Sequence, residues 1–214
     1  DNIKKVDKAT NGKVGYIYIP DMGPEGLNEF SRYFYPQLDK EGLIIDDRAN
    51  GGGNVSPMIL ERLSREPYRL TMRRGSSLIG TVPDAVQVGP KVCLINKYSA
   101  SDGDLFPWGF RALGLGKLIG TRTWGGIIGI SGPLPYMEGT DIRVPFFTSY
   151  DPKTGNWIIE NHGVDPDILI DNDPIKEWNG EDQQLDRAIE EVMKQLKERK
   201  PLAPVPAPRD WSHK

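Results

Sequence analysis

Short apolar runs alternate with amphipathic segments in the first half of the chain, and this alternation constrains the fold more than any other feature. The runs Val14–Ile19 and Leu43–Ile45 have the length and β-branched content of buried strands. Between them, Glu25–Leu38 carries apolar residues at spacings of three and four, which predicts an amphipathic helix. Strands that alternate with helices in this way form parallel sheets. We therefore expect an α/β fold with a mainly parallel sheet and flanking helices.

The second half of the chain is richer in strands. Apolar runs between glycine-rich turns predict strands there, and strands that follow one another without a helix pair as antiparallel hairpins. Glu181–Arg199 has one continuous apolar face and predicts the clearest helix of the chain. The other predicted elements are helices over Val55–Arg65 and Leu105–Leu115 and strands over Val92–Ile95, Lys117–Ile119, Ile127–Ser131 and Ile142–Phe147. The late strands add β-hairpins to the parallel core.

The two ends of the chain differ from the part between them. Residues 1–11 are charged and lack a hydrophobic pattern, so we expect a linker from a region upstream. Residues 200–214 are rich in proline and predict an extended tail. The folded domain is therefore expected over residues 12–199, which is an ordinary size for one domain.

Charge and composition exclude several classes of function. The chain carries 27 lysines and arginines against 30 aspartates and glutamates, and the two signs are interleaved, so it lacks the basic stripe that nucleic-acid binding needs. No apolar run approaches the ~20 residues that cross a membrane. Cys93 is the only cysteine, and His162 and His213 are the only histidines, which excludes a cysteine or histidine cluster for a metal. We expect no metal and no cofactor.

The segment Ile44–Asn54 places three consecutive glycines after a buried strand and before a helix. Without side chains, their backbone N–H groups are open to an oxyanion, a phosphate or another anion. A phosphate is disfavoured because no lysine with a following serine or threonine comes after the glycines, and the pattern G-x-G-x-x-G is missing. An oxyanion hole and a plain flexible turn both remain open.

The segment Asn96–Phe106 forms a second strand–turn–helix junction, with a helix expected to begin near Ser101. A serine there lies at the positive end of the helix dipole, and the next N–H points toward whatever its hydroxyl attacks. Hydrolases place nucleophiles on such turns. Alternatively, Ser99, Ser101 and Asp102 are only helix caps, a common use of serine and aspartate.

Together, the two segments resemble the superfamily of tail-specific and tricorn serine peptidases. The resemblance rests on DDRANGGG at Asp46–Gly53 and SASDGD at Ser99–Asp104, and it extends from GYIYIPDM at Gly15–Met22 to ENHGVDPD at Glu160–Asp167. It is closest to the C-terminal catalytic subdomain of tricorn-type peptidases. It implies a crotonase/ClpP-like fold, in agreement with the parallel sheet expected from the strand–helix alternation.

The resemblance also implies roles for residues of both segments. Ser101 corresponds to the nucleophile, and the backbone N–H of Asp102 to one donor that binds the oxyanion of the tetrahedral intermediate. The second donor corresponds to a glycine of the triplet, either Gly52 or Gly53. Losing one such donor costs about 10²–10³ in rate.

The base that takes the serine proton is not settled by the residues alone. Tail-specific proteases use a lysine that follows the nucleophile, and here Gly126 stands at that place, within Thr123–Ile127. The tricorn branch implies instead a histidine from a segment upstream of this chain, which Glu160 helps to orient through a second serine that is also upstream. His162 is a second possible base, because residues two apart on a strand point to the same side and would share the cleft.

Other conspicuous residues receive structural or specificity roles. Trp108, Phe110, Phe146 and Phe147 are expected in the core or the cleft wall, and Trp178 against the C-terminal helix. Asp47 and Arg48 either pair and brace the glycine loop or form a solvated surface pair. Resemblance to tricorn-type enzymes implies an acidic residue that selects basic substrates, for which Glu61, Glu66 and Asp84 remain open.

The expected function is that of a serine peptidase that cleaves short peptides. The implied partners are peptide substrates and the rest of the same polypeptide, namely an upstream serine–histidine segment, a PDZ-like domain and propellers. The resemblance further implies a homo-oligomer, with a hexamer among the candidate assemblies, and a cytoplasmic location, with an exported one as the alternative. Two other functions remain open: a non-peptidase crotonase-like enzyme, such as an acyl-CoA hydrolase or isomerase, and a non-catalytic peptide-binding module.

Overall fold

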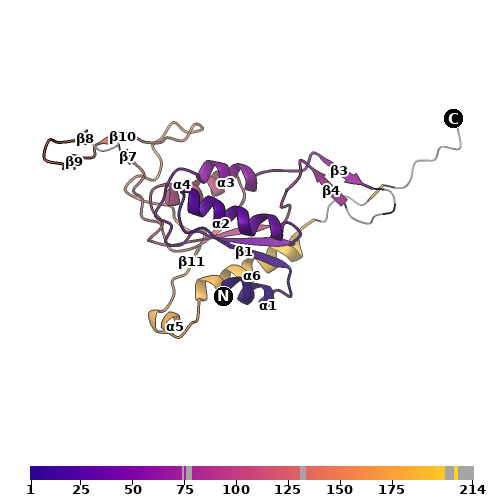
Figure 1. Cartoon of the computed structure of the whole chain (residues 1–214). Helices are drawn as coiled ribbons and strands as arrows, with labels where there is room; N and C mark the ends of the chain where they lie inside the picture. Colours follow the sequence, from indigo (N-terminus) through magenta and orange to yellow (C-terminus); the bar gives the residue numbers. More distant parts are fainter. Residues whose placement is uncertain (74, 76–78, 131–133, 201–204, 207–214) are drawn as a thin grey trace, which may run out of the picture.

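The structure, a computed structural model, describes residues 1–73, 75, 79–130, 134–200 and 205–206 (Figure 1). A five-stranded sheet forms its centre, in the order β1 (Val14–Tyr18), β2 (Gly42–Asp46), β5 (Lys91–Ile95), β6 (Gly116–Gly120) and β11 (Ile168–Leu169). All neighbouring strands in this sheet run parallel. The predicted α/β fold with a mainly parallel sheet is therefore confirmed.

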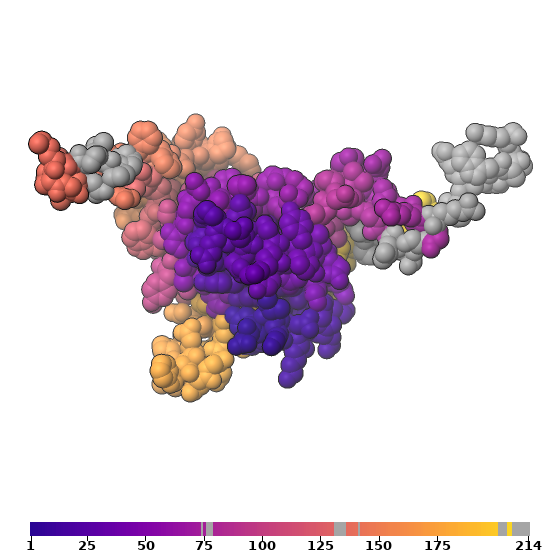
Figure 2. All heavy atoms as spheres, viewed as in Figure 1, coloured from indigo at the N-terminus to yellow at the C-terminus, as the bar shows by residue number. Residues whose placement is uncertain are grey.

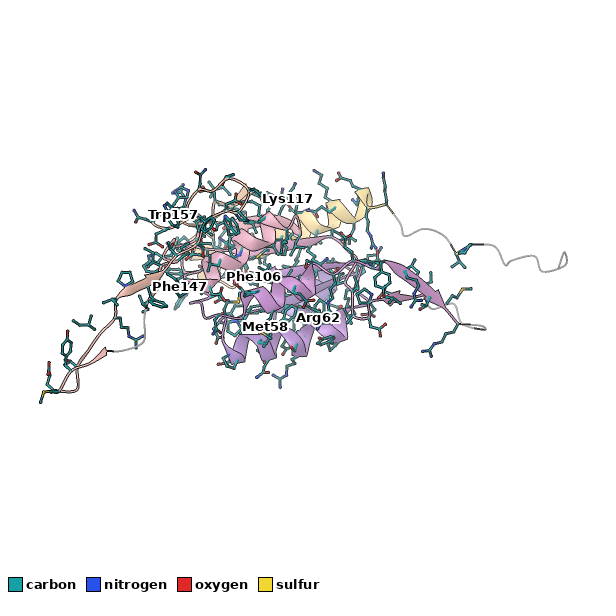
Figure 3. The ribbon with its side chains drawn as sticks, turned by 90° about the horizontal axis from the view of Figure 1, so that it is seen from above. Met58, Arg62, Phe106, Lys117, Phe147 and Trp157 are labelled. Carbon is teal, nitrogen blue, oxygen red and sulfur yellow. The ribbon has the colours of Figure 1, made fainter. Side chains whose placement is uncertain are left out.

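Helices cover both faces of the sheet (Figure 1). One face carries the helices α2 (Pro24–Phe34), α3 (Ser56–Leu63) and α4 (Asp102–Ala112), and the 3₁₀ turn η1 (Tyr35–Gln37) continues α2. The other face carries α1 (Asn2–Ala9) and α6 (Gln183–Glu198). The short helix α5 (Pro174–Trp178) precedes α6. Seen from above, α3 with Met58 and Arg62 lies beside α4 with Phe106 (Figure 3). Within the described ranges, no helix is both long enough and apolar enough to cross a membrane.

Alternation along the strands divides the apolar core into two layers. Ile45 and Cys93 face α2, α3 and α4, whereas Ile44 and Val92, one residue away, face α1 and α6. Because both faces of β2 and β5 are covered, every residue in these strands is buried. Their sequences accordingly read as continuous apolar runs instead of alternating patterns.

Two groups of hairpins project from opposite sides of the body (Figures 1 and 2). One pairs β3 (Arg69–Met72) with β4 (Ile79–Val82); the other pairs β7 (Gly129–Ile130) with β10 (Pro145–Phe147) and β8 (Leu134–Pro135) with β9 (Asp141–Ile142), all antiparallel. The second group confirms the late hairpins, although the strand predicted over Ile142–Phe147 is split in two and Ser131 lies outside the described residues. The first group is not predicted, because its strands are largely exposed and lack an apolar pattern.

Helix α1 corrects the expectation of a linker over residues 1–11. Val6 is fully buried in the layer that α6 covers, and Lys5 pairs with Asp186 of α6 at 2.7 Å. The helix is short and buries only Val6, so its sequence gives a weak signal. Helices this short are marginal alone, and packing against the sheet and α6 stabilises it. The tail predicted over residues 200–214 lies largely outside the described residues and stays a prediction.

The aromatic side chains divide between core and surface. Phe110 is fully buried and Trp108 packs against the same core, as expected. Phe146 and Phe147 are not in the core, because these side chains are 76% and 59% exposed, and their expected place in the cleft wall stays a prediction. The expected packing of Trp178 against the C-terminal helix is wrong, because this side chain is 90% exposed. The two phenylalanines lie on β10, in a hairpin that projects from the body, and Trp178 ends the short helix α5 (Figure 1).

Candidate active site

The loops that follow β2 and β5 meet at one edge of the sheet, because these two strands are parallel neighbours. The Ala100 N–H donates to the Asn50 carbonyl oxygen at 2.8 Å, and the Ser99 hydroxyl donates to the Asp47 carbonyl oxygen at 2.8 Å. The carboxyl ends of adjacent parallel strands are the usual place for a site in such sheets. The structure thus brings the glycine-rich segment and the Ser101 segment together.

Ser101 lies exposed at the tip of a strained turn between β5 and α4. Its φ of 57° and ψ of −121° are rare for a residue with a side chain. Helix α4 begins at the next residue, and the N–H groups of Asp104 and Leu105 donate to the Ser101 carbonyl oxygen at 2.9 and 3.0 Å. The Ser101 hydroxyl therefore stands at a helix N-terminus on a sharp strand-to-helix turn, the geometry of a nucleophile elbow.

Simple capping does not describe this turn. The Ser101 side chain makes no capping hydrogen bond. Ser99 is fully buried and bonded to the β2 loop, and the Asp102 carboxylate accepts hydrogen bonds from the N–H and the hydroxyl of Ser56. Ser99 and Asp102 hold the turn in place, whereas the Ser101 side chain is exposed and takes no part in capping.

Gly52 allows the two loops to approach closely. A Cβ at this residue would lie 2.6 Å from the Ser101 Cβ and 2.9 Å from the Asp102 nitrogen, and φ is 96°. Only glycine tolerates both the contact and the backbone conformation. The Gly52 N–H, however, donates to the side-chain oxygen of Asn50 at 2.9 Å, so it is already engaged.

Gly53 has a different hydrogen-bonding pattern. The Met22 N–H donates to the Gly52 carbonyl oxygen at 2.9 Å, and the Asn54 N–H donates to the Met22 carbonyl oxygen at 2.7 Å. Gly53 lies between the two groups that bond to Met22. In such a parallel bridge, the N–H of Gly53 itself points away from Met22. Among the described residues, the N–H groups of Gly53 and Asp102 have no protein acceptor. These two amides come from different loops at Ser101, and an oxyanion hole needs two such donors.

The family model for peptidase family S41 matches residues 13–170, which contain both loops. The chain belongs to peptidase family S41. The tricorn protease of Thermoplasma volcanium is 43% identical to this chain, and the match covers 93% of this chain and 19% of the relative. The tricorn protease of Thermoplasma acidophilum is 41% identical, and the match covers 92% of this chain and 18% of the relative. The crystal structure of the tricorn protease matches with a TM-score of 0.85 and 41% identity, over 92% of this chain and 19% of that one. The chain therefore spans less than a fifth of the length of these relatives.

In this S41 chain, Gly126 lies directly beside α4, which follows Ser101. The N–H groups of Gly125 and Gly126 donate to the Asp104 carboxylate at 2.8 and 3.3 Å, and burial raises the pKa of Asp104. A Cβ on Gly126 would lie 2.3 Å from the ring of Trp124. A lysine side chain at this position would therefore require Trp124 to move, which agrees with a base from elsewhere.

Glu160 lies in a turn, which corrects the expectation of a continuing strand through His162. The positive φ values of Ile159 and Asn161, 25° and 58°, break the extended conformation. One oxygen of the Glu160 carboxylate, Oε2, accepts hydrogen bonds from the N–H groups of Ile127 and Ile128 at 2.7 and 2.9 Å. The structure thus ties Glu160 to the segment that follows the Gly125–Gly126 pair and leaves Oε1 available.

His162 turns toward a different part of the molecule. Its Nε2 lies 2.8 Å from Oδ2 of Asp165, and this contact holds the pKa of the Asp165 carboxyl below its ordinary value. The ring lines a hollow together with Trp108, Ile159 and other side chains beyond the first turns of α4. Among the described residues, no hydrogen bond joins His162 to Ser101. The geometry gives His162 no support as the base.

Arg48 and Asp47 do not pair, so both expectations for them are wrong. Arg48 is largely buried and forms ion pairs with Asp46 at 2.6 Å and Asp182 at 2.8 Å. Asp47 follows Asp46 in the chain and points to the opposite face, where it is fully buried. Neither of its carboxylate oxygens has a hydrogen-bond partner among the described residues. Burial raises the pKa of Asp47 well above its ordinary value, and the charges of Asp46 and Asp104 raise it further.

Asp47→Asn is expected to change how stability depends on pH. A carboxyl whose pKa is raised on folding binds its proton more tightly in the native state, so the free energy of unfolding falls as pH rises from about 4 toward the folded pKa. Asparagine does not titrate, so the variant gains relative to the wild type as pH increases. Urea unfolding between about pH 5 and about pH 8 measures this difference. A constant difference across that range would show that Asp47 is ionised in the folded protein.

Proposed function

We propose that residues 12–199 form the catalytic subdomain of a tricorn-like serine peptidase, which cleaves short peptides through an acyl-enzyme on Ser101. The observation that carries this proposal is the exposed Ser101 hydroxyl on a strained elbow, beside two amides without acceptors. Membership of peptidase family S41 supports the same assignment. A crotonase-like enzyme that acts without a nucleophile would have no use for this strained serine.

The oxyanion donors are the N–H groups of Asp102 and Gly53. Ser101 Oγ attacks the carbonyl carbon of the scissile bond, and the carbonyl oxygen becomes the oxyanion that these two donors bind. The proton of the hydroxyl goes to the base and then to the leaving amine, after which water hydrolyses the acyl-enzyme. Gly52, whose N–H is engaged with Asn50, serves to bring the two loops into contact.

The general base is a histidine from a segment of the polypeptide outside these 214 residues. Gly126 cannot accept a proton, and His162 is bonded to Asp165. Among the described residues, no hydrogen bond joins Glu160 to Ser101. The hydrogen bonds from Ile127 and Ile128 to Glu160 fix one carboxylate oxygen and leave the other for the upstream serine through which the histidine is oriented. Glu160 therefore acts as the relay.

The partners proposed for the whole polypeptide follow from the length of its relatives. This chain spans 19% and 18% of two tricorn proteases. The remainder is proposed to supply the serine–histidine segment, a PDZ-like domain and propellers, and to assemble into a homo-oligomer such as a hexamer. The proposed location is the cytoplasm, with an exported form as the alternative. The acyl transfer described here requires no metal or cofactor.

A serine-reactive fluorophosphonate tests the proposed function. In the full-length protein, the probe is expected to form an Oγ–phosphorus bond with Ser101 and release fluoride, because the base and the oxyanion hole activate that hydroxyl. Mass spectrometry of the digested protein locates the adduct, and Ser101→Ala is the control. Peptide turnover without labelling at Ser101 would contradict the acyl-enzyme, and labelling without turnover would contradict peptide hydrolysis.

Gly52→Ala is expected to lower kcat/KM by about 10² or more, because its Cβ would displace Ser101 and the Asp102 amide. Gly51→Ala is a matched control in the same triplet, since a Cβ there would meet no atom within 4 Å and its φ is not positive. Kinetics of both variants, with circular dichroism to check folding, measure the effect. Equal rates for the two would show that the glycine loop is only a turn.

A further inference from the structure

Ser56 and Asp102 join the two catalytic loops through hydrogen bonds that the mechanism above does not use. Ser56 is the first residue of α3 and Asp102 the first of α4, and they are only 3% and 6% exposed. The Ser56 N–H donates to Asp102 Oδ2 at 2.9 Å, and the Ser56 hydroxyl donates to Oδ1 of the same carboxylate. One serine thus engages both oxygens of a buried carboxylate.

The two residues lie next to the two oxyanion donors. Asp102 supplies one donor through its own N–H, and Gly53, the other donor, precedes Ser56 by a short segment in the same loop. The N–H groups of Asn54 and Val55 in that segment donate to the Met22 carbonyl oxygen at 2.7 and 3.0 Å. The segment is therefore held by Met22, in the loop after β1, on one side and by Asp102 on the other, which fixes the two amides relative to each other.

The charge of Asp102 gives the hydrogen bonds a second consequence. Among the described residues, no lysine or arginine pairs with this carboxylate. Its hydrogen-bond donors are the N–H and the hydroxyl of Ser56, the first residue of α3. The positive end of a helix dipole stabilises a carboxylate at its first turn. Without the Ser56 hydroxyl, the uncompensated negative charge would repel the oxyanion that forms at the Asp102 N–H.

We propose that Ser56 is a positioning residue of the oxyanion hole, which aligns the Asp102 and Gly53 amides and compensates the Asp102 carboxylate. The inference rests on the proposed peptidase function. It places Ser56 outside contact with the substrate and predicts an effect on the transition state more than on substrate binding. Loss of the hydroxyl should therefore lower kcat and leave KM nearly unchanged.

The test compares three variants in the full-length protein. Ser56→Ala is expected to lower kcat about tenfold to a hundredfold, since a misplacement of about 1 Å can cost on the order of 10². Ser56→Cys keeps most of the side-chain volume but donates only weakly, so it should also lower kcat. Ser64→Ala, at the other end of α3, removes a hydroxyl that donates only to the Glu61 carbonyl oxygen, and should leave kcat unchanged.

Binding of a peptide aldehyde separates positioning from a general loss of structure. The hemiacetal that the aldehyde forms with Ser101 needs the oxyanion hole, so the two Ser56 variants should lose affinity for it in proportion to kcat. An unchanged kcat in either folded variant, or a change in KM alone, would overturn the inference. If the wild type and Ser64→Ala fail to turn over peptides, the proposed function fails, whereas equal turnover by all four proteins removes only the role of Ser56.

Discussion

Ser101→Ala is expected to lower kcat by on the order of 10⁴ to 10⁶ in the full-length protein and to leave the thermal midpoint nearly unchanged. The rate falls because the variant removes the hydroxyl that is proposed to attack the scissile carbonyl. The midpoint stays, because the Ser101 side chain is exposed and makes no capping hydrogen bond. Steady-state hydrolysis of a fluorogenic peptide and a thermal melt measure the two quantities.

Ser99→Ala is the matched control for this prediction. Its hydroxyl is fully buried and donates to the Asp47 carbonyl oxygen at 2.8 Å, so its loss should lower stability and affect turnover much less. The two serines lie in the same turn, and a loss of structure there would affect both variants alike. Equal losses of activity with intact folding would show that Ser101 is not the nucleophile.

The sequence predicts the central sheet well because its strands are buried on both faces. The runs at β1, β2 and β5 contain little but apolar residues, and the flanking helices have clear periodicity. The elements that escape prediction lack such a pattern. Helix α1 buries only Val6, and the strands β3 and β4 form a largely exposed hairpin, so each contributes too little buried apolar surface to give a clear signal.

The residues of the site were accessible from the sequence to different degrees. The two loops and Ser101 follow from short motifs, but the choice between Gly52 and Gly53 depends on which N–H is already engaged by Asn50. Strand alternation could have shown that Asp46 and Asp47 face opposite sides. The pairing of Arg48 with Asp182 joins residues far apart in the chain and has no local signal. Ser56 and Asp104 were missed because their roles arise only when α3, α4 and the Gly125–Gly126 turn are in place.

The central claim is that Ser101 depends on a base that these 214 residues do not contain. A serine hydroxyl is a weak nucleophile near neutral pH unless a base removes its proton during attack. Gly126 has no basic group, Asp102 directs its carboxylate to Ser56, and His162 lies against Asp165. Loss of a general base typically costs about 10² to 10⁴ in rate, and more where base and nucleophile act as a unit.

Turnover of a fluorogenic di- or tripeptide by the 214-residue chain and by the full-length protein, measured side by side, tests this claim most directly. The folded 214-residue chain is expected to hydrolyse the peptide very slowly or not at all, and activity is expected to return when the upstream segment is restored in cis or by mixing. The claim is contradicted if the 214-residue chain matches the full-length rate and loses it on His162→Ala, because His162 would then be the base.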